Sequence, residues 1–165
     1  MKSSWVVVAV AGLLSLAACE RRDAATPTPT RETVFQHHLS GDISGDYRPT
    51  GDGSIQPVGS LFIGQDDAFA AWEGGSRASP PLILSLTAPQ GEIRVLPDVY
   101  VVTDDRIQMR GSAPGMGPVE LSARIDQGAL ATARRNLGDQ TPVVTGTISA
   151  NGRRTPFTLS WWGGD

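Results

Sequence analysis

The chain has 165 residues, of which 39% are hydrophobic and 19% charged, and its formal net charge is −3. This length predicts one compact domain, and 19 glycines with 12 prolines favour many turns and short strands. Phosphate backbones are bound by a concentrated positive face. The acidic balance therefore argues against nucleic acid as a partner.

Residues 1–18 have the features of an export signal. Lys2 provides a positive start, and an apolar run extends from Trp5 to Leu16. This run is shorter than the ~20 residues that a membrane-spanning helix needs. It therefore predicts a cleaved signal peptide.

The leader ends in Leu16-Ala17-Ala18-Cys19, which resembles the lipobox of bacterial lipoprotein precursors. The resemblance implies that a diacylglyceryl group joins the sulfur of Cys19 and that cleavage occurs between Ala18 and Cys19. It also implies a membrane anchor in the cell envelope, because several acyl chains hold far more firmly than one. Glu20 stands where family members retained in the inner membrane tend to have Asp, so the outer membrane is implied in a Gram-negative cell.

Cys19 is the only cysteine of the chain. No disulfide within the chain and no cysteine zinc cluster is therefore expected, and lipidation would leave no thiol for catalysis. The alternative is a plain secretory leader with an incidental cysteine. That alternative would leave a secreted protein with one unpaired thiol.

Residues 19–33 are predicted to form a lipidated N-terminus followed by a flexible tether. The segment has no apolar periodicity and contains Pro27 and Pro29. From Glu20 to Thr33 it would reach about 46 Å if fully stretched, and proline stiffens such segments. The folded part would then stand clear of the membrane.

Residues 34–165 are predicted to form one β-rich globular domain. Apolar or alternating runs between turn residues indicate strands. In chain order the expected strands are Phe35–Tyr47, Val58–Ile63, Leu82–Ala88, Val99–Thr103, Arg106–Arg110, Val119–Ile125, Val143–Ala150 and Arg153–Trp162. Two pairs form hairpins, one around Asp104-Asp105 and one around Asn151-Gly152, which suits a type I′ turn.

Two short helices are expected between these strands. The first is expected to be capped by Asp66, to continue through Trp72 and to end at Gly74. The second begins at Asp126 and stops at Gly138. The predicted fold is mainly β, a small antiparallel β-sandwich or barrel with one or two short covering helices.

Candidate binding residues lie on the strand faces that point away from the predicted core. Alternation places Arg106, Arg110 and Arg124 on one outer face, where cations would contact anionic glycans or lipid headgroups. Trp162 points away from the side of Phe157 and Trp161, so it either packs beneath a helix or contacts a partner or sugar. The alternative for the arginines is a solvated face without a ligand.

Candidate catalytic and metal-binding residues are few. His37 and His38 are the only histidines and face opposite sides of a strand, so they do not share a metal. Either one would need a carboxylate such as Asp42 or Asp46 to act as a general base. The sequence lacks nucleophile-elbow, zinc-protease and phosphate-loop motifs, and no catalytic residue, metal or cofactor is predicted.

The segment Thr145–Leu159 resembles the closing hairpin of the YceI-like lipid-binding barrels, which carry a T-G-x-L-x-x-x-G-x-x-x-P-x-x-L run. This resemblance implies a carrier of a hydrophobic ligand in a barrel cavity. The leading hypothesis is instead a membrane-anchored, non-enzymatic envelope lipoprotein that binds a protein or glycan partner. An enzyme is the third alternative.

Overall fold

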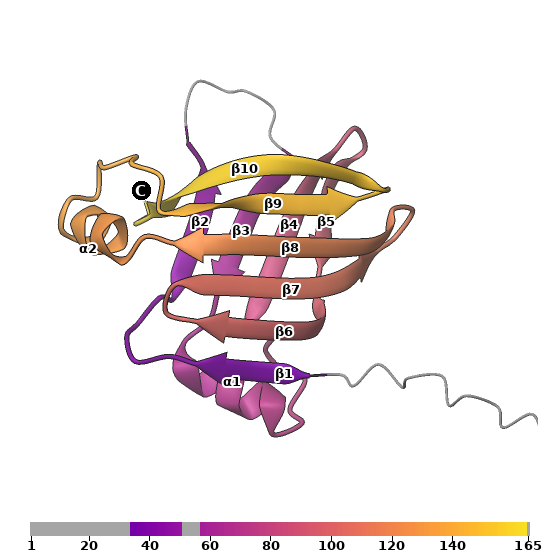
Figure 1. The fold of residues 1–165 in the computed structure, drawn as a ribbon, viewed down its shortest axis with the longest axis horizontal. Coiled ribbons are helices and arrows are strands. Elements are labelled where there is room, and N and C mark those ends of the chain that lie inside the picture. Colours follow the sequence, from indigo (N-terminus) through magenta and orange to yellow (C-terminus); the bar gives the residue numbers. More distant parts are fainter. Residues whose placement is uncertain (1–33, 51–56, 165) are drawn as a thin grey trace, which may run out of the picture. The chain divides into compact units, whose positions relative to one another are not determined.

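The computed structural model of the chain describes residues 34–50 and 57–164, in which ten strands and two helices are seen (Figure 1). The strands are β1 (Phe35–His38), β2 (Gly45–Pro49), β3 (Val58–Ile63), β4 (Leu82–Ala88), β5 (Gly91–Val95), β6 (Pro97–Thr103), β7 (Arg106–Ala113), β8 (Gly117–Ile125), β9 (Val144–Ala150) and β10 (Arg153–Trp162). The helices are α1 (Asp66–Glu73) and α2 (Gln127–Arg135).

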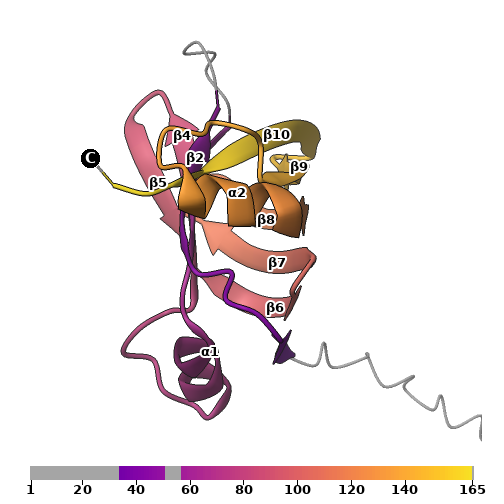
Figure 2. The same ribbon diagram turned by 90° about the vertical axis from the view of Figure 1, so that its left-hand side faces the viewer.

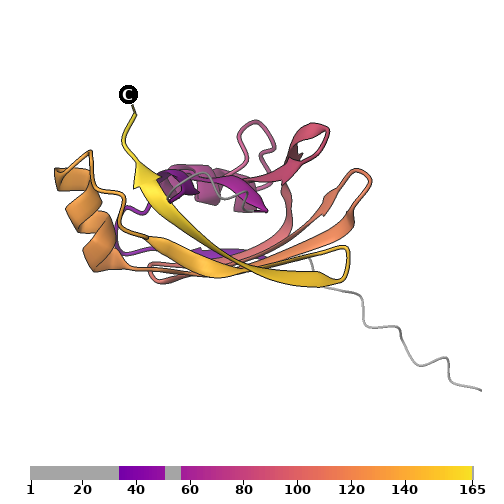
Figure 3. The same ribbon diagram turned by 90° about the horizontal axis from the view of Figure 1, so that it is seen from above.

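The ten strands form one sheet in the order β1-β6-β7-β8-β9-β10-β2-β3-β4-β5. The sheet curls into a half-barrel, with β6 to β9 in one layer and β2 to β5 in the layer behind it (Figures 1 and 3). Strand β10 pairs with β9 on one side and with β2 on the other, so it joins the layers. The predicted mainly β fold with two short helices is confirmed.

The core lies between the two layers and follows from strand alternation. Every second residue of β8 is buried, and the same pattern fills the inner side of β7. Buried residues of β2, β3 and β4 face β7 and β8 from the other layer, among them Tyr47, Leu61 and Leu84. Each fully buried large aliphatic side chain stabilises the fold by about 1.5–3 kcal/mol relative to exposure. One face of each layer therefore packs against the core.

Strand boundaries match the sequence prediction closely in the C-terminal half. The hairpin at Asn151-Gly152 has positive φ at both residues, 51° and 71°, as a type I′ turn requires. The predicted strand Phe35–Tyr47 is wrong as one unit, because residues 39–44 form a connection between β1 and β2. Strand β5 was not predicted, because Gly91–Val95 follows β4 after a short turn with a mixed polar pattern.

Strand β1 departs from the antiparallel expectation, because it pairs in parallel with β6. The connection from Leu39 to Ser44 leads directly to the opposite layer, so β1 has no hairpin partner in sequence. Its partner β6 lies far along the chain, and no local sequence pattern encodes the pairing of such distant strands.

Both helices form close to their predicted positions. Asp126 accepts a hydrogen bond from the backbone N–H of Ala129 at 2.9 Å and so caps α2 as expected, but the helix ends at Arg135 before Gly138. The expected cap of α1 is wrong by one residue. Gln65 is the N-cap and gives no side-chain hydrogen bond, while Asp66 lies in the first turn, where a negative charge is favourable.

The two helices lie at different places around the sheet. Helix α2 lies beside one end of β8 and β9, and α1 lies next to β1 (Figures 1 and 2). None of the helices in residues 34–50 and 57–164 is long and apolar enough to cross a membrane.

Candidate functional site: the arginine face

The outer side of β7, β8, β9 and β10 carries polar and cationic side chains, which we call the arginine face. Its members are Arg106, Gln108, Arg110, Glu120, Ser122, Arg124, Thr145, Thr147, Ser149 and Arg154. They share one face because each strand alternates buried and outward residues, and the registers align the outward ones. The core residues thus determine which side chains reach solvent.

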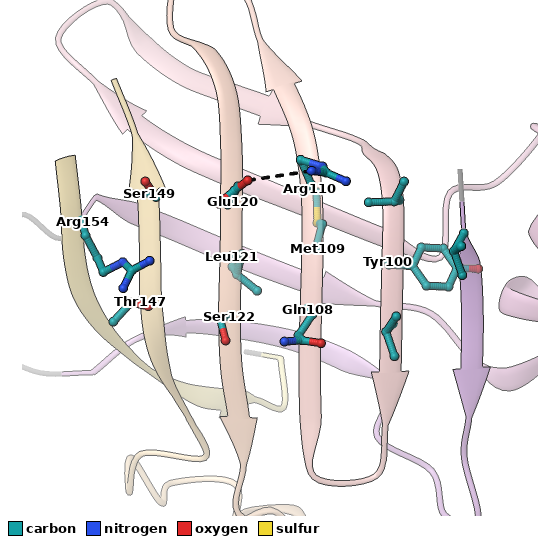
Figure 4. Close-up of a pocket in the computed structure, with 13 residues that line it drawn as sticks. Tyr100, Gln108, Met109, Arg110, Glu120, Leu121, Ser122, Thr147, Ser149 and Arg154 are labelled. Atoms are coloured by element: carbon teal, nitrogen blue, oxygen red, sulfur yellow. Dashed lines mark ion pairs between the residues drawn. The ribbon is translucent and has the colours of Figure 1, made fainter. Parts of the chain in front are cut away.

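An open hollow of about 390 Å³ lies on this face (Figure 4). Val34, Val99 and Val101 contribute an apolar side near β1 and β6. The remaining lining consists of Tyr100, Met109 and Leu121 together with the polar residues Gln108, Arg110, Glu120, Ser122, Thr147, Ser149 and Arg154. Such a surface offers many hydrogen bonds beside an apolar area of similar size.

Charge is unevenly balanced across the arginine face. The Arg110 guanidinium lies 4.0 Å from a Glu120 carboxylate oxygen. Arg106 and Arg124 lie directly opposite each other on β7 and β8, and neither has an ion pair among the described residues. Like charges directly opposite on neighbouring strands destabilise a sheet. This pair therefore costs stability and concentrates positive potential at one point.

Arg154 adds a further cation at the opposite side of the hollow. Figure 4 shows its side chain reaching from β10 toward Thr147 and Ser149 of β9. Arg154 also has no ion pair within residues 34–50 and 57–164. The face as a whole thus carries four arginines and one glutamate.

The structure brings together three of the four candidate binding residues. Arg106, Arg110 and Arg124 share the outer face, as alternation predicts. Trp162 lies near the far end of β10, paired with Asp46 of β2, and its ring is stacked by the Arg48 guanidinium 3.3 Å from the ring centre. Trp162 is half-buried and does not line the hollow. Ala18 and Cys19 fall outside the described residues.

Arg154, Glu120 and the hydroxyls of β9 escaped the sequence prediction. Alternation around the Asn151-Gly152 turn does place Arg154 opposite to Phe157. The sequence contains no signal, however, that β8 pairs with β9, because α2 separates them in the chain. The sequence therefore did not reveal that these side chains lie on neighbouring strands.

His37 contacts two carboxylates, both from helix α1. Its Nδ1 lies 2.8 Å from Oε1 of Glu73, and its Nε2 lies 3.1 Å from Oδ1 of Asp66. The ring stacks on Phe69 at 5.3 Å between ring centres. Asp42 and Asp46, named above as examples of a carboxylate that a histidine would need, are not the ones that His37 contacts, because α1 packs on β1 and supplies both partners.

The same cluster includes Tyr100, whose hydroxyl donates to Oε1 of Glu73 at 3.2 Å. Burial, helped by the Glu73 carboxylate, raises the pKa of the Tyr100 hydroxyl and keeps its proton in place. Both ring nitrogens of His37 lie within hydrogen-bond distance of carboxylates on α1, so the side chain connects β1 to that helix. We therefore assign the cluster a structural role.

His38 points to the opposite side of β1, where its Nε2 lies 2.8 Å from the amide nitrogen of Gln36. The two histidines are thus separated as predicted. No group of three or more metal-binding side chains is found in the part of the chain that the structure describes. Neither histidine therefore belongs to a metal site with three or more side-chain ligands among the described residues.

The interior of the half-barrel is occupied by side chains. The largest fully buried ones are Tyr47, Tyr100, Phe69, Ile43, Leu61, Ile63, Leu82, Leu84, Ile107, Leu130, Leu159 and Val58. A hydrophobic-ligand carrier needs space that its own side chains leave unfilled. The arrangement of the described core gives no support to that alternative.

Comparison of the chain with protein-family models, with curated proteins and with solved structures finds no match. Its function is therefore inferred from the residues and their geometry.

Proposed function

We propose that this chain is an envelope lipoprotein whose β-rich domain binds an anionic partner, without catalysis, through the arginine face. The lipid on Cys19 and the tether that follows it would keep the domain at a membrane. The outer strands would present the binding surface.

The observation that carries the binding proposal is the opposed pair Arg106 and Arg124. Each has an exposed side chain and lacks an ion pair among the described residues, although the two face each other across neighbouring strands. An anion placed between them would relieve their repulsion and accept several N–H donors in the planar geometry that guanidinium groups favour. The proposal thus gives a role to an arrangement that otherwise only costs stability.

Anchoring is tested by Cys19→Ser in the full chain. Lipidation depends on the Cys19 sulfur, so the variant should lose lipid and shift from the membrane fraction to the soluble fraction. Mass spectrometry of the mature N-terminus and fractionation of the cells measure both effects. Unchanged processing and fractionation would refute the anchor.

Binding is tested with the unlipidated full chain carrying Cys19→Ser, mixed with purified cell envelopes. We expect retention that weakens as salt rises, because the contacts are electrostatic. Adding Arg106→Ala and Arg124→Ala should lower the affinity about tenfold, which corresponds to ~0.7 kcal/mol for each arginine. The matched control is Arg94→Ala, which removes an exposed arginine from β5, outside the arginine face. Equal retention of all forms would refute the proposal.

A further inference from the structure

We infer that the anionic partner is a linear acidic glycan that lies across the strands of the arginine face. This inference rests on the proposed function and names the ligand class of the same site. It follows from the order in which charged and neutral polar groups appear on that face.

The registers arrange the outward side chains in three rows that run across the strands. The first row contains Arg106, Arg124, Thr145 and Thr158. The second contains Gln108, Ser122, Thr147 and Pro156. The third contains Arg110, Glu120, Ser149 and Arg154. Cations therefore occur in the outer two rows, and the row between them is uncharged, with three side chains that donate and accept hydrogen bonds.

The row spacing requires an extended ligand. Outward residues two apart on a strand are separated by about 7 Å, so the first and third rows lie about 14 Å apart. Arg124 and Arg154 are also two strands apart, or roughly 10 Å. One small anion at Arg106 and Arg124 cannot reach Arg154 as well. A chain with anionic groups separated by neutral units can contact both places.

The neutral groups favour a saccharide over a densely charged polymer. Hydroxyl and amide side chains both donate and accept, as sugar hydroxyls do. Glu120 lies inside the hollow between the cations, and it would repel a polymer that carries a negative charge on every unit. Sugar hydroxyls next to Glu120 would instead donate to its carboxylate.

A membrane surface is less suited to this face. Among the described residues the exposed large hydrophobic side chains are Val34, Leu96 and Leu137, and only Val34 lines the hollow. Peripheral membrane binding uses apolar side chains that enter the headgroup region or clusters of about 4–8 basic residues. The face has four arginines, the lowest number in that range, and Glu120 beside Arg110 lowers its net charge to +3 (4 − 1). The apolar side chains of the hollow other than Val34 are buried or half-buried, so they do not project for insertion.

The experiment measures binding of the unlipidated full chain to oligomers of alternating glucuronate and N-acetylglucosamine (hyaluronan) by calorimetry, because their anionic units are separated by neutral ones. Neutral maltose oligomers of equal length and vesicles with anionic phosphatidylglycerol serve as alternative probes. We expect the hyaluronan octamer to bind at least tenfold more tightly than the dimer, which carries one anionic group, and than the neutral octamer.

Variants identify the two contact places. Arg106→Ala with Arg124→Ala should weaken binding of both the dimer and the octamer, because this pair holds one anionic group. Arg154→Ala should weaken the octamer several-fold and leave the dimer unchanged. Glu120→Gln should improve binding of inorganic polyphosphate, and Arg94→Ala should alter none of these affinities.

The outcomes separate this inference from the proposed function. Vesicle binding that needs Arg106 and Arg124, without octamer binding, would overturn the glycan and leave an anionic partner in place. Absence of binding to every anionic probe, or equal binding by all variants, would overturn both.

Discussion

Asp104 joins two loops that are distant in the sequence. Its Oδ1 accepts from the backbone N–H of Ser40 at 2.8 Å and of Gly41 at 3.2 Å, and its Oδ2 accepts from the Ser40 hydroxyl at 2.5 Å. The residue thus connects the β6–β7 turn with the connection after β1. A turn residue predicted only for its backbone preference also fixes a long-range contact.

Asp104→Ala should lower the free energy of unfolding by about 1 kcal/mol at neutral pH, because exposed hydrogen bonds to a carboxylate are only moderately strong. The Ser40 hydroxyl and amide, with the Gly41 amide, hold the pKa of Asp104 below its usual 3.8. The native state therefore binds the proton less readily than the unfolded state. The stabilisation is present above about pH 4 and is lost as the pH falls through the lowered value.

Urea unfolding of both forms between pH 2 and pH 7 measures this difference. The two stabilities should converge at the acidic end. A difference that stays constant over the whole range would contradict the role of the ionised carboxylate.

His37 should be coupled more strongly to Glu73 than to Asp66. The Glu73 contact is shorter, 2.8 Å against 3.1 Å, and its side chain is 26% exposed, whereas that of Asp66 is 69% exposed. We expect a coupling energy of about 1 kcal/mol for the pair with Glu73 and a smaller one with Asp66.

Double-mutant cycles with His37→Phe, Glu73→Gln and Asp66→Asn provide the measurement, with phenylalanine chosen to keep the stack on Phe69. A larger coupling to Asp66 would show that exposure does not govern the strength of these contacts.

At the scale of elements, α2 is held against the sheet from two sides. Leu130 and Ala133 are buried, and Arg134 reaches back to the connection between β1 and β2. Its two terminal nitrogens donate to the carbonyl oxygens of Asp42 and Ser44, each at 2.7 Å. The helix position therefore depends on one side chain that contacts a distant loop.

Arg134→Ala should destabilise the protein by about 1–2 kcal/mol and increase hydrogen exchange in α2, because both carbonyls lose a charged donor. The destabilisation caused by Arg134→Lys should lie between that of Arg134→Ala and zero, because a lysine keeps the positive charge but cannot donate in the same forked geometry. Arg135→Ala is the matched control, because Arg135 is exposed and its only side-chain hydrogen bond within residues 34–50 and 57–164 is a long one to Thr132 at 3.5 Å. A loss for Arg135→Ala as large as for Arg134→Ala would contradict the assignment.

At the scale of the whole domain, the curl of the sheet depends on a close approach at Gly111. One residue, Leu96, connects β5 at one edge of the sheet with β6 near the other edge. A Cβ atom at Gly111 of β7 would overlap the Leu96 carbonyl oxygen and lie 2.8 Å from Cγ1 of Val95. Only glycine leaves room for this corner to cross β7.

Gly111→Ala should therefore reduce the free energy of unfolding by about 3 kcal/mol, as overpacking against a backbone atom does. Gly41→Ala is the control, because no atom lies within 4 Å of its Cβ position. Thermal or urea unfolding measures both, and a stable Gly111→Ala form would show that the corner can move.

The alternation of apolar residues was enough to predict most strands, both hairpin turns and the outward orientation of Arg106, Arg110 and Arg124. Each of these features depends on neighbours within a few residues, so the local sequence encodes it. The partners of His37 and the position of Arg154 on the same face as Glu120 and Arg110 could not be predicted. Both result from contacts between segments that are far apart in the chain.

The sequence by itself determined a mainly β fold and its hairpin turns, and it predicts an export leader and a lipid anchor at Cys19. Only the tertiary structure decided that β1 pairs in parallel with β6 and that four arginines from three strands share one face. The physical reason is that side-chain alternation is a local property of a strand. Its register against a distant strand is set by how the complete set of apolar faces packs into one core.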